Sequence, residues 1–277
     1  MSYKRILTIQ DISCVGQCSL TVALPIISAC GVECCVLPSA VLSTHTAGFD
    51  GYTFRDLTDD MPLINEHWKK EGIQFDAVYT GYLGSTKQIQ YVMDIFNSAA
   101  KAGSFKIVDP AMADNGKLYP GFDAEFVSAM KKLCGKADYV VPNITEACFL
   151  TNTEYRTEYD EEYINELIAK LISLGSKNVV LTGVSYAPSK TGVIVYDGET
   201  KQYYEHELLK NSCHGTGDVY ASSFVGALVN GHSAYNSAKI AADYTVECIK
   251  ETAKLDNHWY GAAFEKALPK LIKLINA

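Results

Sequence analysis

Short apolar segments alternate with amphipathic ones along this chain, and that alternation limits its possible folds more than any other feature. Hydrophobic residues recur every three or four positions over 164–172, which predicts a helix with one buried face. Strand, helix, strand in repetition is typical of a parallel sheet covered by helices on both faces. With 277 residues and 48% hydrophobic content, we expect one α/β domain over residues 1–277.

The expected strands are positions 5–10, 32–42, 77–80, 106–108, 139–141 and 178–181, with a hairpin formed by 191–196 and 202–207. The expected helices are positions 17–29, 59–71, 89–96, 126–130 and 164–172, with mostly helical structure from 215 onward. A polar loop is expected over 43–54. The sequence contains no internal repeat and no linker.

Charge and hydropathy exclude several classes of partner. There are 32 acidic and 24 basic residues, a net charge of -8, so neither nucleic acid nor an anionic membrane is an expected partner. No apolar run reaches 18 residues, so we expect no membrane span. The first apolar run is broken by Gln10 and Asp11, so we expect no signal peptide and a cytoplasmic location.

The nine cysteines form no C-x-x-C pair and no zinc-binding spacing, so they are expected to be reduced and mostly buried. Cys213 is the exception, because it lies beside the turn described next and could be reactive.

The most informative segment is Ser212 to Ala221, in which Gly215-Thr216-Gly217-Asp218 stands between an expected strand and an expected helix. A Gly-Thr-Gly turn at a helix start directs unpaired N–H groups and the positive end of the helix dipole at one point, which suits a phosphate. Asp218 at the edge of such a site would act most simply as a general base. The alternative is an ordinary helix N-terminus, where glycine and aspartate are also favoured.

Polar or glycine residues follow six expected strands in turn. In parallel sheets, ligands bind beyond the carboxyl ends of the strands, so these residues should share one edge. Any one of them could be only a turn former or a helix cap. They are Asp11, Ser43 to Thr46, Thr80-Gly81-Tyr82, Asp109-Pro110, Asn143 with Glu146, and Thr182-Gly183.

Asp109 and Glu146 could hold Mg²⁺, which binds one or two carboxylates plus water in phosphoryl-transfer sites. The chain has no Walker A sequence, no G-x-G-x-x-G fingerprint, no G-x-S-x-G elbow and no zincin motif. P-loop, dinucleotide-binding, serine-hydrolase and zincin chemistry are therefore not expected.

These segments together resemble the ribokinase-like superfamily, and within it the pyridoxal (vitamin B6) kinases. The resemblance runs nearly end to end, through five motifs in the family's order. They are Ser43-Thr44-His45-Thr46-Ala47-Gly48-Phe49, Thr80-Gly81-Tyr82-Leu83-Gly84-Ser85, Asp109-Pro110-Ala111-Met112-Ala113-Asp114, Pro142-Asn143-Ile144-Thr145-Glu146-Ala147 and Gly215-Thr216-Gly217-Asp218.

The resemblance implies a ribokinase-like fold and ATP-dependent phosphorylation of the 5′-hydroxymethyl group of pyridoxal, pyridoxine or pyridoxamine. It makes Asp218 the base and Gly215, Thr216 and Gly217 the cradle for the transferred phosphoryl group. It also implies a homodimer and possible use of a monovalent cation. Its remaining implied contacts are Asp11, His45, Thr46 and Tyr82 for the substrate, Thr182, Gly183 and Asn143 for ATP, and Asp109 and Glu146 for Mg²⁺.

The sequence departs from that family at three positions. Asp11 stands where the pyridoxal kinases usually have serine, and a carboxylate there favours a protonated ring nitrogen or an amino group. Ala111 and Ala113 are smaller changes. The segment Asn211 to Gly217 also resembles the hydroxymethylpyrimidine kinases, which place cysteine where this chain has Asp218. That activity, or a catalytically silent B6- or nucleotide-binding sensor, is the alternative.

Overall fold

A nine-stranded, mostly parallel sheet forms the centre of the molecule in the computed structural model, which describes residues 3–209 and 213–277. Its strand order is β11-β10-β9-β8-β5-β4-β1-β2-β3. The strands from β9 to β2 run parallel to their neighbours, whereas β3, β10 and β11 pair antiparallel at the two ends. The predicted α/β fold, with a mostly parallel central sheet, is confirmed.

The strands are β1 (Arg5–Ser13), β2 (Glu33–Leu42), β3 (Phe54–Asp56), β4 (Phe75–Thr80), β5 (Ala100–Val108), β6 (Ala113–Asp114), β7 (Lys117–Leu118), β8 (Tyr139–Val140), β9 (Asn178–Val184), β10 (Lys190–Tyr196) and β11 (Lys201–Glu207). The helices are α1 (Leu20–Ala29), α2 (Asp60–Lys70), α3 (Thr86–Ser98), α4 (Ala124–Cys134), α5 (Ile144–Thr151), α6 (Glu161–Ser173), α7 (Thr216–Asn230), α8 (Ala234–Thr252) and α9 (Leu268–Ile275), with a 3-10 turn at Phe264–Ala267.

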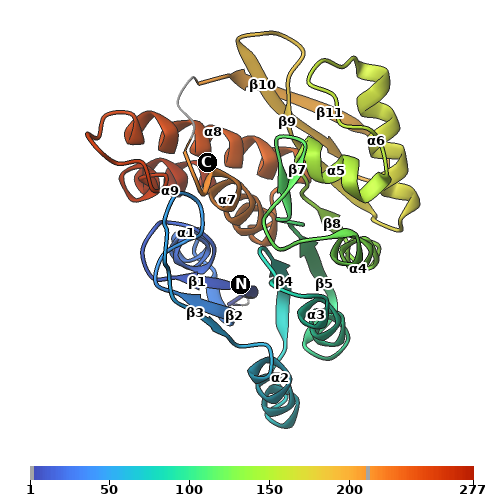
Figure 1. Cartoon of the computed structure of the whole chain (residues 1–277), viewed down its shortest axis with the longest axis vertical. Helices are drawn as coiled ribbons and strands as arrows, with labels where there is room; N and C mark the ends of the chain where they lie inside the picture. Colours follow the sequence, from blue (N-terminus) through green and yellow to red (C-terminus); the bar gives the residue numbers. More distant parts are fainter. Residues whose placement is uncertain (1–2, 210–212) are drawn as a thin grey trace.

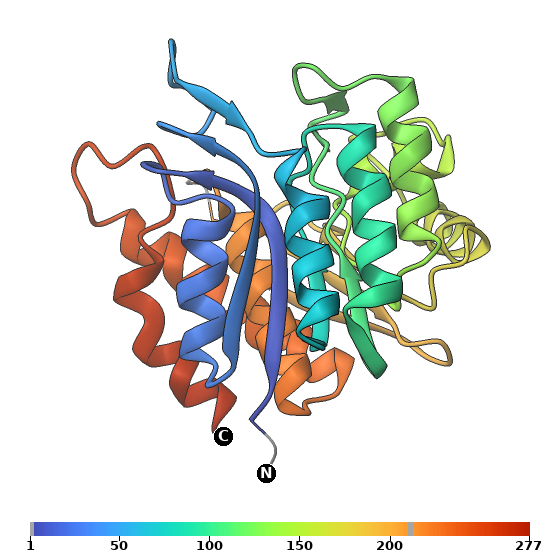
Figure 2. The same cartoon turned by 90° about the horizontal axis from the view of Figure 1, so that it is seen from below.

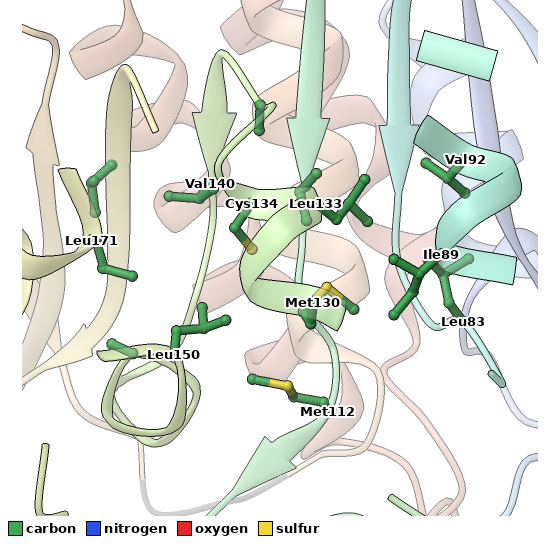
Figure 3. Close-up of a cluster of buried hydrophobic side chains, with 14 of the residues drawn as sticks. Leu83, Ile89, Val92, Met112, Met130, Leu133, Cys134, Val140, Leu150 and Leu171 are labelled. Atoms are coloured by element: carbon green, nitrogen blue, oxygen red, sulfur yellow. The ribbon is translucent and has the colours of Figure 1, made fainter. Parts of the chain in front are cut away.

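Helices cover both faces of this sheet, as the alternating pattern predicts. On one face, α1, α7 and α8 bury residues such as Ile27 and Phe224 against the strands. On the other face, α3, α4, α5 and α6 enclose the larger core cluster, part of which Figure 3 shows around Met130 and Leu133. Figure 1 shows α1, α7, α8 and α9 on one side of the strands and α2 to α6 on the other. Among the helices that the structure describes, none has the length and apolar character needed to cross a bilayer.

The first helix starts three residues later than the sequence predicts. Gly16, Gln17 and Ser19 all have positive φ values, of 126°, 50° and 55°, and such backbone cannot belong to a right-handed helix. The preceding strand is longer than predicted and reaches Ser13, so Asp11 lies inside the end of β1 rather than after it. The register against β2 shifts between Gln10 and Ile12, at the position of Asp11.

Four short elements escape prediction. The expected loop over 43–54 ends in the edge strand β3, β6 and β7 form a two-residue hairpin after β5, and α5 begins directly after Asn143. Short elements of two to eight residues carry too few residues for a period to be recognised. Figure 2 shows the loop between β2 and β3 projecting beyond the helical layers, at the same end of the molecule as the loop after α8.

Candidate active site

The phosphate-binding turn predicted from sequence forms the start of α7. Gly215 adopts a left-handed conformation (φ 76°) as the N-cap, and a Cβ on it would lie 2.3 Å from the carbonyl oxygen of Gln17. The first bond of the helix joins the Val219 N–H to the Gly215 oxygen over 3.0 Å, so the preceding amides of the turn remain available to an anion. Ser212, with which this segment begins in the sequence, lies outside the described residues.

Asp218 occupies the first turn of α7 and is half-buried. Its Oδ2 accepts a hydrogen bond from the backbone N–H of Ser19 over 3.0 Å. Burial raises the pKa of Asp218 to about 6, the Ser19 bond opposes this rise, and the nearby Asp11 carboxylate adds to it. A carboxylate with a pKa in this range suits a general base near neutral pH.

Glu146 is held as a buried carboxylate at the start of α5. Asn143 and Glu146 form a capping box, in which Asn143 Oδ1 accepts from the Glu146 N–H and Glu146 Oε2 accepts from the Asn143 N–H, each over 2.9 Å. Glu146 Oε1 accepts from the Met112 N–H over 3.1 Å. Burial, and then the charge of Asp109, raise the pKa of Glu146 well above its usual range.

Asp109 follows β5 and is 8% exposed. Its Oδ1 accepts from the Ala111 N–H over 3.1 Å. Burial, and then the charge of Asp218, raise the pKa of Asp109 to about 7. The three carboxylates of Asp109, Glu146 and Asp218 therefore interact electrostatically, although they come from three separate parts of the chain.

Asp109 and Glu146 fit a magnesium ion that is held mainly through water. Two buried carboxylates with raised pKa values gain stability from a nearby cation. Both oxygens of Glu146 already accept backbone bonds, which favours indirect contact through water. Within residues 3–209 and 213–277, no group of three His, Cys, Asp or Glu side chains is arranged to hold a metal by itself, so water would complete the shell, as Mg²⁺ prefers.

Asp11 and Tyr82, two of the residues predicted to hold the acceptor, lie near each other. Asp11 is 5% exposed, and its carboxylate accepts a hydrogen bond from Ser13 Oγ over 3.0 Å. Burial raises its pKa, and the side chains of Ser19 and Ser13 oppose that rise. Burial, and then the charge of Asp11, raise the pKa of Tyr82 to about 12, which places the two side chains within electrostatic reach. The charge of Asp11 therefore raises the pKa values of both Tyr82 and Asp218.

His45 is buried and uses both ring nitrogens within the protein. Nδ1 accepts from the Ala47 N–H over 3.1 Å, so Nε2 carries the hydrogen and donates to the carbonyl of Tyr260 over 2.7 Å. A ligand could therefore meet only the face or edge of this ring. Thr46, the next residue, is exposed.

A loop after α8 reaches this site, and the sequence patterns did not predict it. The Trp259 ring packs 4.7 Å from that of Phe49, and His258 Nε2 lies 2.9 Å from Gln17 Oε1. The His45 ring lies 5.5 Å from that of His214, which belongs to the phosphate-binding turn. The sequence signal for this loop is the run of three aromatic rings from His258 to Tyr260. A local pattern does not predict which part of the fold such a run will pack against.

The residues predicted to hold ATP lie beside Glu146. Thr182 lies in β9, and its Oγ1 donates to the Pro142 carbonyl over 3.3 Å. A parallel bridge pairs Thr182 with Asn143. Gly183 is exposed with φ 75°, and a Cβ on it would meet no atom within 4 Å. All three residues therefore share the edge where Asp109 and Glu146 lie.

Cys213 does not have the surroundings of a reactive thiolate. Its side chain packs against the cluster formed by α1, α8 and the C-terminal segment. Burial raises the pKa of its thiol, which lowers the thiolate fraction at neutral pH.

Comparison with known proteins shows which family the chain matches. The family model described as phosphomethylpyrimidine kinase matches residues 24–262. The chain is 29% identical over 210 residues to the pyridoxine kinase of Bacillus subtilis, covering 72% of each chain.

Two solved structures are similar over nearly the whole chain. One is a candidate phosphomethylpyrimidine kinase of Bacteroides thetaiotaomicron, crystallised with pyridoxal: identity is 38%, the TM-score is 0.91, and 98% of this chain and 96% of that one are covered. The other is the pyridoxal kinase of Lactobacillus plantarum, with 30% identity, a TM-score of 0.90, and coverage of 99% and 98%.

Proposed function

The chain belongs to the phosphomethylpyrimidine kinase family and is a phosphotransferase with an alcohol acceptor, and from that premise we propose that it phosphorylates B6 vitamers. The acceptor would be the 5′-hydroxymethyl group of pyridoxal, pyridoxine or pyridoxamine, and ATP would be the donor. The ribokinase-like fold of the pyridoxal kinases, predicted from five motifs, is present here.

The observation that carries the proposal is the position of Asp218 in the first turn of α7, directly after the turn from Gly215 to Gly217, where its carboxylate is bonded to Ser19. Asp11 and Asp109 each interact with it electrostatically. In the proposed reaction, Asp218 takes the proton of the acceptor hydroxyl while that oxygen attacks the γ-phosphorus of ATP. The bond from this phosphorus to the bridging oxygen breaks, and ADP leaves.

The turn from Gly215 to Gly217 would stabilise the transferring group. Its amides and the helix dipole face the place where negative charge develops, and no side chain has to reorganise. Asp109 and Glu146 would hold Mg²⁺ through water, with Thr182, Gly183 and Asn143 beside the nucleotide. The ion would neutralise charge on the phosphates of ATP.

Asp11 supports an acceptor that offers a proton. A buried carboxylate binds a pyridinium N–H or an amino group better than it binds a bare ring nitrogen. The same feature supports the second candidate, a hydroxymethylpyrimidine kinase, whose acceptor carries an amino group. Asp218 favours the B6 assignment, because the hydroxymethylpyrimidine kinases resembled by this segment have cysteine at that position.

The proposal is tested by ADP release with Mg·ATP and four acceptors: pyridoxal, pyridoxine, pyridoxamine and 4-amino-5-hydroxymethyl-2-methylpyrimidine. We expect kcat/KM for at least one vitamer to exceed that for the pyrimidine about tenfold or more. A preference for the pyrimidine would replace the B6 assignment by the second candidate. Binding of a vitamer without turnover would indicate a sensor instead.

A further inference from the structure

The loop that follows α8 (residues 256–261, the aromatic loop) is joined to the other described residues by two hydrogen bonds, and both end in loops of the candidate active site. His45 Nε2 donates to the Tyr260 carbonyl over 2.7 Å. His258 Nε2 donates to Gln17 Oε1 over 2.9 Å. Much of the loop is exposed, so its position depends on these two bonds and on the packing of its rings.

Two glycines allow the aromatic loop to approach the acceptor loop (residues 43–49) closely. A Cβ on Gly48 would lie 2.8 Å from the Trp259 ring, and a Cβ on Gly16 would lie 2.1 Å from Cδ2 of His45, both closer than real Cβ atoms come. The Phe49 ring centroid lies 4.7 Å from that of Trp259 and 5.0 Å from that of His45. A side chain at either glycine would separate the loops, so their contact depends on these two residues.

The loop after β1 (residues 14–19) connects the aromatic loop to the phosphate-binding turn. Gln17 Nε2 donates to both oxygens of Glu265 over 2.8 Å, which leaves Oε1 as the acceptor for His258. The Gln17 carbonyl oxygen lies against Gly215, and the same loop supplies the N–H that holds the proposed base. The aromatic loop is therefore attached to the segment that fixes the reaction centre.

We propose that the aromatic loop forms a wall of the acceptor site and that His45 is the positioning residue that holds it there. The two ring nitrogens of His45 bond to Ala47 in the acceptor loop and to Tyr260 in the aromatic loop, so this one side chain joins the two loops. Its ring also lies 5.5 Å from that of His214 in the phosphate-binding turn. The inference deepens the proposed function and rests on it.

Loss of this anchor should weaken acceptor binding rather than slow the chemical step. Without the bond from His45, the aromatic loop occupies its place only part of the time, and the apparent affinity for the acceptor falls by that fraction. Once the acceptor is bound, the wall is complete and Asp218 keeps its bond to Ser19, so the rate of transfer is retained.

The kinetic test compares His45→Phe with His232→Phe. Phenylalanine keeps a ring but removes both bonds of His45, so KM for the preferred of the four acceptors should rise about tenfold, with kcat and KM for ATP within about threefold of the wild type. His45→Gln, which keeps an N–H donor on a side chain of similar reach, should restore most of the affinity for the acceptor.

His232 is the matched control, because its Nε2 also bonds to a backbone carbonyl, that of Ile275, over 3.1 Å. That bond lies near the C-terminus, at the end of the molecule opposite the aromatic loop (Figure 2). His232→Phe should leave the acceptor KM unchanged.

Tryptophan fluorescence tests the anchor without any turnover. The chain has two tryptophans, so Trp68→Phe leaves Trp259 as the only one. Trp259 is 51% exposed. Release of the loop can therefore raise quenching of Trp259 by acrylamide about twofold at most. In this background we expect an increase approaching that limit for His45→Phe and no increase for His232→Phe.

An unchanged acceptor KM in His45→Phe, a loss of kcat alone, or an equal effect of His232→Phe would overturn the proposal. If His45→Phe does not fold, His258→Phe removes the other bond of the loop and should change KM and quenching in the same direction. If the wild type turns over none of the four acceptors, the proposed function fails by itself. Quenching of Trp259 then still decides whether His45 holds the loop, and equal quenching in wild type and variant refutes it.

Discussion

The backbone N–H of Ser19 donates to Oδ2 of Asp218 over 3.0 Å, across 199 positions of sequence. This bond joins the loop after β1 to the first turn of α7. Ser19 has a positive φ of 55°, as do Gly16 and Gln17 in the same loop, at 126° and 50°. One oxygen of Asp218 is thereby fixed, and in the proposed reaction the other takes the proton.

Replacing Asp218 by asparagine should lower kcat by about a thousandfold or more, because the amide keeps the shape but cannot accept the proton. The asparagine oxygen can still accept the Ser19 bond, so the melting temperature should be no lower than that of the wild type and the ADP affinity should be similar. Steady-state kinetics with calorimetric titration of ADP would check this. A rate near that of the wild type would remove Asp218 from the mechanism.

The acid limb of kcat/KM should lie near pH 6. The base must be ionised, and burial raises the pKa of Asp218 to about 6, so activity is lost as the pH falls through that value. The limb should stay at the same pH when pyridoxine replaces pyridoxamine, since it belongs to the enzyme. A limb that moves with the acceptor would instead report ionisation of the substrate.

Replacing Asp109 by asparagine should stabilise the metal-free protein at pH 8. Burial, and then Asp218, raise the pKa of Asp109 from 3.8 to about 7, so its contribution to stability is present below its ordinary pKa and is lost as pH rises through 7. The ionised carboxylate then costs at most about 4 kcal/mol. The gain in the free energy of unfolding that Asp109→Asn produces should become smaller toward pH 4.

Urea unfolding of both proteins at pH 4 and pH 8, with and without Mg²⁺, would measure this difference. Mg²⁺ should stabilise the wild type more than Asp109→Asn. Asp197→Asn is the opposite control, because hydrogen bonds from Thr200 lower the pKa of that carboxyl. Loss of the Asp197 carboxylate should destabilise the protein at pH 8. If the two substitutions changed the free energy of unfolding equally between pH 4 and pH 8, the assigned environment of Asp109 would be contradicted.

Replacing Gly215 by alanine should cost both stability and turnover. The new Cβ would lie 2.3 Å from the Gln17 oxygen, and the residue would keep φ near 76°. Gly231 at the other end of α7 has φ 102° but no atom within 4 Å of a built Cβ. Gly231→Ala should therefore cost only the left-handed strain, about 1–2 kcal/mol, with kcat unchanged. Melting temperatures and kinetics of both variants would separate the cost of the left-handed φ from the cost of the clash between the new Cβ and the Gln17 oxygen.

Replacing Asp11 by serine should change the preference among acceptors. Loss of the buried carboxylate weakens binding of a protonated ring or an amino group, so kcat/KM should fall most for the acceptor that depends on it. Kinetics with the four acceptors would measure the ratios. Unchanged ratios would exclude Asp11 from specificity.

Local patterns in the sequence determined the type of fold and the identity of most candidate residues. Alternating strands and helices require a covered parallel sheet, and the order of these elements along the chain is enough to place Asp109, Asn143 and Thr182 at one edge. The Gly215 turn was equally readable, since glycine at a helix start fixes a local conformation. Short elements such as β3 could not be predicted from the sequence, because three residues are too few to show a hydrophobic period.

Only the tertiary structure decided how these residues act on one another. That Asp11 raises the pKa of Asp218, and that Asp218 in turn raises the pKa of Asp109, depends on burial and on the distance between separate elements. The bond from His45 to the Tyr260 carbonyl joins positions 215 apart. Sequence periodicity records which face of an element is buried, whereas charge interactions depend on which elements the completed packing brings together.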